Sequence, residues 1–260
     1  MMTDIFLPIG AGLVIGVLIG LTGMGGGALM TPFLITVMGL NTVLAVGTDL
    51  VFATITKLFG SIEHRREKNV SIRNVLWMAC GSLPAANLSA RYLIGQIENT
   101  ELIEVTLPRL LGGVLLLVGG IILVRNVLGE RPPDDIEVEM PRPMGLIVIG
   151  AIGGTLVGLT SIGGGTVIMA LLILFYSLPV QYMVGLDVVH GALLAGTTAV
   201  TYAYNGQTNW GLVGLLLIGS LPGVWFGAWS VSHVNQTYVR YILSGIILLT
   251  GLNMFWGGGH

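Results

Sequence analysis

Two aspartates stand inside long apolar segments, where a charged side chain is costly. Asp49 ends a Val-Gly-Thr-Asp motif at 46–49, and Asp187 ends a Val-Gly-Leu-Asp motif at 184–187. A carboxylate at the centre of a membrane-spanning helix costs about 2.5–3.5 kcal/mol on insertion scales. Two interpretations remain open. Each aspartate either caps a helix or takes part in a structural pair, or it binds a coupling cation or a proton.

Two further polar side chains share these segments. His190 lies three residues after Asp187, on the same face of a helix. It is either hydrogen-bonded to Asp187 or serves as a proton relay or an anion contact. Lys57 lies near the expected end of its segment, where it either carries its amine to the membrane surface or gates the substrate path.

Two glycine-rich stretches interrupt apolar sequence, one around Gly25 and one around Gly163. Each glycine weakens a helix by about 1 kcal/mol, so we expect the chain to unwind there. The half-helix that follows presents free N–H groups and a positive dipole end, which hold small anions. The residues expected to bind the anion are Thr22, Gly23, Gly25, Gly26, Gly27, Thr160, Ser161, Gly163, Gly164, Gly165 and Thr166.

Close helix packing is the alternative explanation for glycine in such segments, because small residues four apart let two backbones approach. It accounts well for the ladders Gly12/Gly16/Gly20 and Gly150/Gly154/Gly158. It accounts poorly for three consecutive glycines, since only some of them can face one neighbour.

The elements that carry these residues are helices of a membrane protein. Of the 260 residues, 53% are hydrophobic and 9% are charged, whereas soluble domains carry about 25% charged residues. We expect an all-α polytopic protein with about ten transmembrane segments. The predicted segments are 5–21, 28–39, 44–61, 72–94, 107–128, 145–160, 166–178, 183–204, 210–231 and 238–257. The two short ones, 28–39 and 166–178, are expected to be half-helices or to continue from their predecessors.

The chain repeats itself at a constant spacing of 138 residues (163 − 25). The glycine ladders, the two aspartate motifs and a Gly-Ser-Leu-Pro motif at 81–84 and 219–222 all keep this spacing. We therefore expect two transmembrane repeats, 1–128 and 144–260, joined by a linker at 129–143. Five crossings per repeat place the second repeat in the inverted orientation, with both broken helices near the midplane.

Most lysines and arginines fall on one side in this topology. We therefore expect an integral protein of the cell (inner) membrane. The positive-inside rule places its linker 129–143 in the cytoplasm and both termini on the outer side. The basic residues are scattered, so nucleic acid is not an expected partner. The expected partners are a small anionic substrate and membrane lipid, and the glycine ridges could also serve a homodimer. No metal-binding or hydrolase pattern occurs, so we expect no enzyme activity, no catalytic residues, no metal and no cofactor.

The paired motifs resemble those of the sulfite exporter TauE/SafE family of membrane permeases. The resemblance rests on Gly-Leu-Thr-Gly-Met-Gly-Gly-Gly at 20–27, Gly-Leu-Thr-Ser-Ile-Gly-Gly-Gly at 158–165, and the aspartate and Gly-Ser-Leu-Pro motifs. It implies transport of sulfur-containing anions such as sulfite or organosulfonates. It also implies a site role for both glycine stretches and for Asp49 and Asp187. It assigns no role to His190 or Lys57.

The residues favour a secondary transporter for a small anion that works by alternating access, with proton or sodium as candidate coupling ions, and the resemblance implies that the anion contains sulfur. A passive anion channel with the same fold is the alternative.

Overall fold

The chain folds into helices in a computed structural model that describes residues 3–22, 27–64, 71–128, 141–162, 167–176, 180–230, 233–234 and 236–257. Within these ranges there are ten α-helices and one short π-helix. Their bounds are α1 Thr3–Thr22, α2 Gly27–Thr36, α3 Thr42–His64, α4 Ile72–Gly95, η1 Glu101–Thr106, α5 Leu107–Leu128, α6 Pro143–Thr160, α7 Val167–Phe175, α8 Val180–Tyr204, α9 Trp210–Ser230 and α10 Gln236–Gly257.

The observed helices follow the predicted segments closely, and the all-helical class is confirmed. Among the described residues, four helices are long and apolar enough to cross a membrane by length and composition: Thr42–Phe59, Glu101–Val124, Pro143–Thr160 and Trp210–Ser230. The expected number of about ten transmembrane segments stays a prediction. The short segments form the separate helices α2 and α7. Residues 129–140 of the predicted linker lie outside the described residues, and its last residue, Pro143, already begins α6.

Local capping explains where several helices begin. The Ser71 side chain accepts a hydrogen bond from the Asn74 amide at the start of α4. Asn209 does the same for the Leu212 amide at the start of α9. Such caps satisfy amides that have no partner inside the helix. Ser71 and Asn209 are 138 positions apart, so the two copies of this helix start in the same way.

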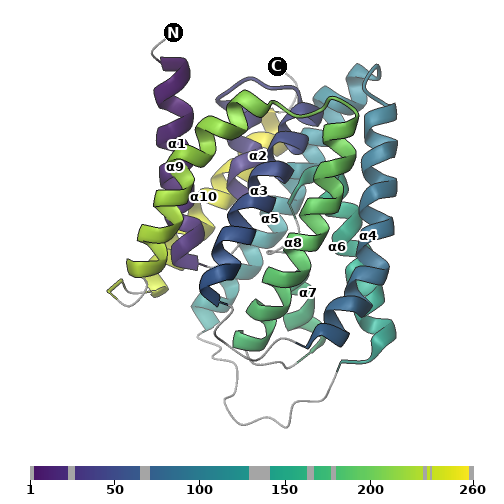
Figure 1. The fold of residues 1–260 in the computed structure, drawn as a ribbon, viewed down its shortest axis with the longest axis vertical. Coiled ribbons are helices and arrows are strands. Elements are labelled where there is room, and N and C mark those ends of the chain that lie inside the picture. Colours follow the sequence, from purple (N-terminus) through teal and green to yellow (C-terminus); the bar gives the residue numbers. More distant parts are fainter. Residues whose placement is uncertain are drawn as a thin grey trace.

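The helices lie side by side in pairs that join the first and second halves of the chain. Figure 1 shows α1 beside α9 at one side, α4 beside α6 at the other, and α3 and α8 between them. Helix α5 packs mainly against α10. In each side pair, one helix comes from residues before the linker and its neighbour from residues after it.

The glycine ladders are the contact surfaces of the side pairs. Gly12, Gly16 and Gly20 of α1 face the carbonyl groups of residues 216, 220 and 224 in α9. Gly150, Gly154 and Gly158 of α6 face those of residues 78, 82 and 86 in α4. Each set of carbonyls is displaced by 138 positions from the other, so the same packing occurs twice. A Cβ added at Gly16 would lie 2.5 Å from the Ser220 carbonyl oxygen, which no side chain tolerates.

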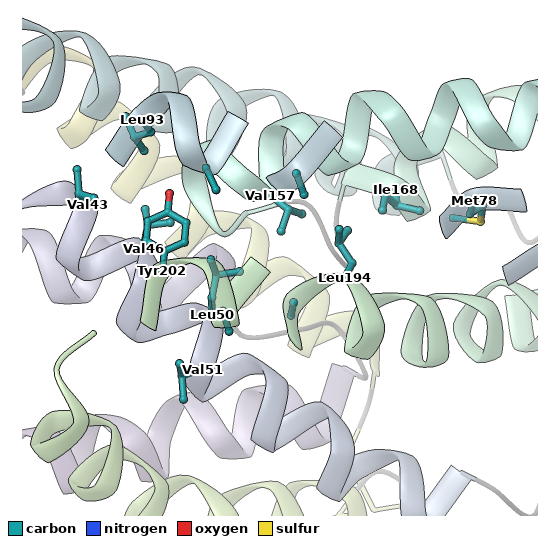
Figure 2. Packing of buried hydrophobic residues seen from close by; sticks show 14 of the residues in the cluster. Val43, Val46, Leu50, Val51, Met78, Leu93, Val157, Ile168, Leu194 and Tyr202 are labelled. Carbon is teal, nitrogen blue, oxygen red and sulfur yellow. The ribbon is translucent and has the colours of Figure 1, made fainter. Parts of the chain in front are cut away.

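Helix α8 contributes several side chains to a large core cluster that it shares with α3, α4 and α6. Tyr202 is the largest fully buried side chain of the cluster and lies beside Val46 and Leu50 of α3 (Figure 2). Its hydroxyl donates a 2.6 Å hydrogen bond to the Gly158 carbonyl near the end of α6. This contact connects α8 to the last turn of α6, just before the stretch around Gly163 that is predicted to unwind.

Replacing ladder glycines by alanine tests the close packing. In an exposed helix interior, Gly→Ala stabilises by about 1 kcal/mol. We expect Gly16→Ala and Gly154→Ala to destabilise instead, by about 1–3 kcal/mol, because the new methyl group overlaps a backbone carbonyl. Gly214→Ala in α9 is the control, since a Cβ there meets nothing within 4 Å. The measurement is unfolding of the purified protein in detergent, and equal effects at Gly16 and Gly214 would contradict the assignment.

Candidate functional site

Asp49 lies in the middle of α3 and is fully buried. Thr31, in the short helix α2, donates a 2.5 Å hydrogen bond to its Oδ2 atom. Its second oxygen, Oδ1, has no hydrogen-bond partner among the described residues. Helix α3 continues through Gly47 and Thr48 without a break, so the interpretation of Asp49 as a helix cap is wrong.

The end of α6 reaches the same carboxylate from the other half of the chain. Helix α6 ends at Thr160, and Ser161 takes up a left-handed backbone conformation with φ 58°. This conformation costs about 1 kcal/mol or more for a residue with a side chain. It redirects the chain and brings the Ser161 hydroxyl close to the carboxyl of Asp49. The two groups make no regular hydrogen bond, and Ser161 Oγ has no partner among the described residues.

Residues that flank the two glycine stretches share one apolar cluster. Ala28, just after the start of α2, and Ile162, just after the end of α6, belong to one buried apolar cluster with side chains of α5 and α10. Of the predicted anion-binding residues, Gly23, Gly25, Gly26, Gly163, Gly164, Gly165, Thr166 and the side chain of Thr22 lie outside what the structure describes. Gly27 is the first residue of α2. The Thr160 hydroxyl donates to the Leu156 carbonyl and accepts from the Ile162 amide.

Asp187 also lies inside a continuous helix, α8, and is almost fully buried. Its Oδ2 atom forms an ion pair with Lys57 of α3, at an N–O distance of 3.6 Å. The Lys57 side chain is only 9% exposed. The interpretation that Lys57 carries its amine to the membrane surface is therefore wrong. Structural pairing of Asp187 is therefore observed and helix capping is not, whereas its alternative role in binding a coupling cation or proton stays a prediction.

His190 is fully buried one turn after Asp187. Its Nε2 atom lies 2.7 Å from the Ser82 hydroxyl of α4. The expected hydrogen bond to Asp187 is not observed between these two described residues, and Nδ1 has no partner among the described residues. Residues three apart share a helical face, but their side chains can still point to different neighbours.

The two halves therefore carry different chemistry at equivalent positions. Thr31 corresponds to Met169, so Asp187 has no counterpart of the Thr31 hydroxyl. Lys57 corresponds to Ala195, so the second half has no lysine at the equivalent position. The equivalents of Ser82 and His190 are Ser220 and Phe52. Ser220 Oγ is buried without a partner among the described residues.

Sequence reasoning missed Thr31 and Ser82 as partners of the charged and titratable groups. Ser82 belongs to the repeated Gly-Ser-Leu-Pro motif, and this repetition was the available signal. Nothing comparable pointed to Thr31, because its equivalent is Met169 and only the fold places it against Asp49.

Apolar helices that bury carboxylates, a histidine and a lysine among one another are typical of an integral membrane transporter. The chain belongs to the sulfite exporter TauE/SafE family, whose model matches residues 8–254. The resemblance stated from the motifs is thereby confirmed.

Curated relatives span nearly the whole chain. "Probable membrane transporter protein YjnA" of Bacillus subtilis (strain 168) is 37% identical over 247 residues, which cover 94% of this chain and 96% of the relative. "Probable membrane transporter protein MJ0441" of Methanocaldococcus jannaschii is 26% identical over 257 residues, covering 94% and 92%. The family and these relatives are described as transporters, not enzymes. No solved structure matches the chain significantly.

Removing the Thr31 hydroxyl tests the environment of Asp49. We expect Thr31→Val to destabilise the protein by about 1–3 kcal/mol, because a buried carboxylate loses its hydrogen-bond donor. Thr56→Val is the matched control: Thr56 is likewise buried but lies in α3 and donates only to carbonyls of its own helix. Denaturation in detergent measures both, and a loss at Thr56 as large as at Thr31 would contradict the role of Thr31.

The Lys57–Asp187 pair is tested by removing one partner or both. We expect Lys57→Met to destabilise by about 3–5 kcal/mol, because it leaves a buried uncompensated carboxylate. The double variant Lys57→Met/Asp187→Asn should recover most of this loss, since no charge remains to be desolvated. Unfolding of the single and double variants is compared with that of the wild type. A double variant no more stable than Lys57→Met would argue against the pair.

Proposed function

We propose that the protein is a secondary transporter that moves a small sulfur-containing anion, such as sulfite or an organosulfonate, across the cell (inner) membrane. Its two halves, 1–128 and 144–260, are inverted repeats of five transmembrane segments each, ten in all. The halves move against each other and so expose the substrate site to one side of the membrane and then to the other. The termini lie outside and the linker 129–143 lies in the cytoplasm, as the distribution of lysine and arginine indicates.

One observation carries the proposal: the packing of α1 on α9 is repeated by α6 on α4. Gly16 faces the Ser220 carbonyl and Gly154 faces the Ser82 carbonyl, and each member of one pair is 138 positions from its equivalent in the other. In the second pair, each helix of the first pair is replaced by its equivalent from the other half of the chain, as a two-fold relationship between the repeats requires. Two equivalent halves around one site provide the two alternative arrangements that alternating access needs.

The anionic substrate follows from the helix ends between the halves. Short helix α2 begins at Gly27, the last glycine of the first stretch, and α7 begins at Val167, two residues after the last glycine of the second. Their N-termini carry a partial positive charge and unpaired amides, which favour anions by about 0.3–2 kcal/mol each. Ala28 and Ile162 share one apolar cluster, which supports convergence of the two stretches. The description of the family as sulfite exporters supports a sulfur oxyanion or sulfonate as the substrate.

Sulfite flux into proteoliposomes tests this function. We expect wild-type protein to transport sulfite and Gly25→Leu and Gly163→Leu to abolish flux, because a large side chain blocks access to backbone amides. Gly214→Leu is the control, since the space at its Cβ is open. Unchanged flux in both glycine-stretch variants would remove the site assignment, and open-channel currents in electrical recordings would contradict alternating access.

A further inference from the structure

The two equivalent aspartates are neutralised in different ways. Asp187 has a lysine within the protein, because Lys57 lies 3.6 Å from its Oδ2 atom. Within the described residues no ion pair is formed by Asp49, although it is equally buried. Asp49 receives one hydrogen bond, from Thr31. Burial of an unpaired carboxylate is strongly unfavourable, so either a proton or a bound cation must neutralise Asp49.

Two oxygen atoms at Asp49 are available to such a cation. Asp49 Oδ1 and Ser161 Oγ are both buried, and both are without a hydrogen-bond partner among the described residues. They belong to side chains that lie close together. Thr31 holds the other carboxylate oxygen and so fixes the direction of Oδ1. Oxygen ligands of this kind suit a hard cation rather than a transition metal.

The end of α6 adds to this preference. Ser161 is the C-terminal cap of α6, and the carbonyl end of a helix carries a partial negative charge. This charge lies beside an already anionic carboxylate, so the local field favours a cation. In transporters with broken helices, the C-terminal ends of half-helices and unwound carbonyls commonly coordinate sodium.

We propose that Asp49, Ser161 and the carbonyl end of α6 form a sodium-binding site, with Thr31 as its positioning residue. At the equivalent position in the other half, the Lys57 side chain supplies a fixed positive charge to Asp187. Only the site at Asp49 therefore binds and releases an ion. A role of sodium in coupling rests on the proposed transport function, whereas sodium binding at Asp49 does not depend on that function. Each transport cycle would then carry one sodium ion beside the anion.

Sodium binding is measured without substrate, by thermal unfolding of the full chain in detergent. Sodium chloride is titrated against potassium chloride and choline chloride at constant ionic strength and pH. We expect a saturable rise of the melting temperature with sodium only, because a ligand that binds the folded state stabilises it. Asp49→Asn should abolish the rise, and Ser161→Ala should weaken the apparent sodium affinity by roughly tenfold or more.

Ser220→Ala is the matched control, because Ser220 is also a buried serine whose Oγ has no partner among the described residues. It should keep the wild-type sodium response. If Asp49→Asn does not fold, the comparison of Ser161→Ala with Ser220→Ala decides the question. A wild type whose melting temperature responds equally to all three salts overturns the proposal. A full sodium response in Asp49→Asn or Ser161→Ala does so as well.

Flux experiments separate this proposal from the transport function. Sulfite flux that is intact in the absence of sodium, together with no sodium-dependent stabilisation, contradicts the sodium site and leaves the transport function standing. Sodium-dependent stabilisation in a protein that transports no sulfite contradicts the transport function and leaves the sodium site standing.

Discussion

The close approach of backbones at the glycine ladders is the constraint on which the arrangement of helices depends. Lipid is as apolar as a leucine side chain, so burial of apolar surface does not drive helices together inside a membrane. Close packing has to do so, and it requires residues without a side chain. Gly12, Gly16 and Gly20 meet this requirement against α9, and the ladder in α6 meets it against α4. The two side pairs then leave α3 and α8 to pack against each other in the centre.

The same scaffold supports unequal chemistry in its two halves. Equivalent aspartates occupy α3 and α8, but a threonine contacts one and a lysine the other. His190 pairs with Ser82, whereas Phe52, its equivalent, belongs to an apolar cluster. Packing is therefore symmetric and charge is not. A symmetric scaffold can move between two arrangements of similar energy, while an asymmetric charge distribution lets one of its two equivalent positions take on a separate task.

The two helix ends that flank residues 163–166 carry opposite partial charges. The Ser161 side chain at the carbonyl end of α6 lies close to Asp49, and the amide end of α7 begins at Val167, after residues 163–166. In the proposed mechanism a cation at the first end and an anion at the second would attract each other in a region of low dielectric constant. The attraction would couple the binding of the two ions without direct contact between the substrate and Asp49.

Much of this fold could be predicted from sequence because its strongest signals are local or periodic. Apolar length gave the helix positions, capping residues such as Ser71 and Asn209 fit their starts, and a spacing of 138 residues related the two halves. These features depend on each segment alone or on comparing two segments. Side-chain partners could not be predicted, since they depend on which helices become neighbours.

Sequence alone determined that this protein is a helical membrane protein with two matching halves and one buried aspartate in each. Tertiary structure decided that Lys57 pairs with Asp187 rather than reaching the membrane surface, and that His190 pairs with Ser82. It also brought Ser161 of one half to Asp49 of the other. The physical reason is that a helix specifies which face a residue occupies, whereas the partner on that face comes from another helix far away in the chain.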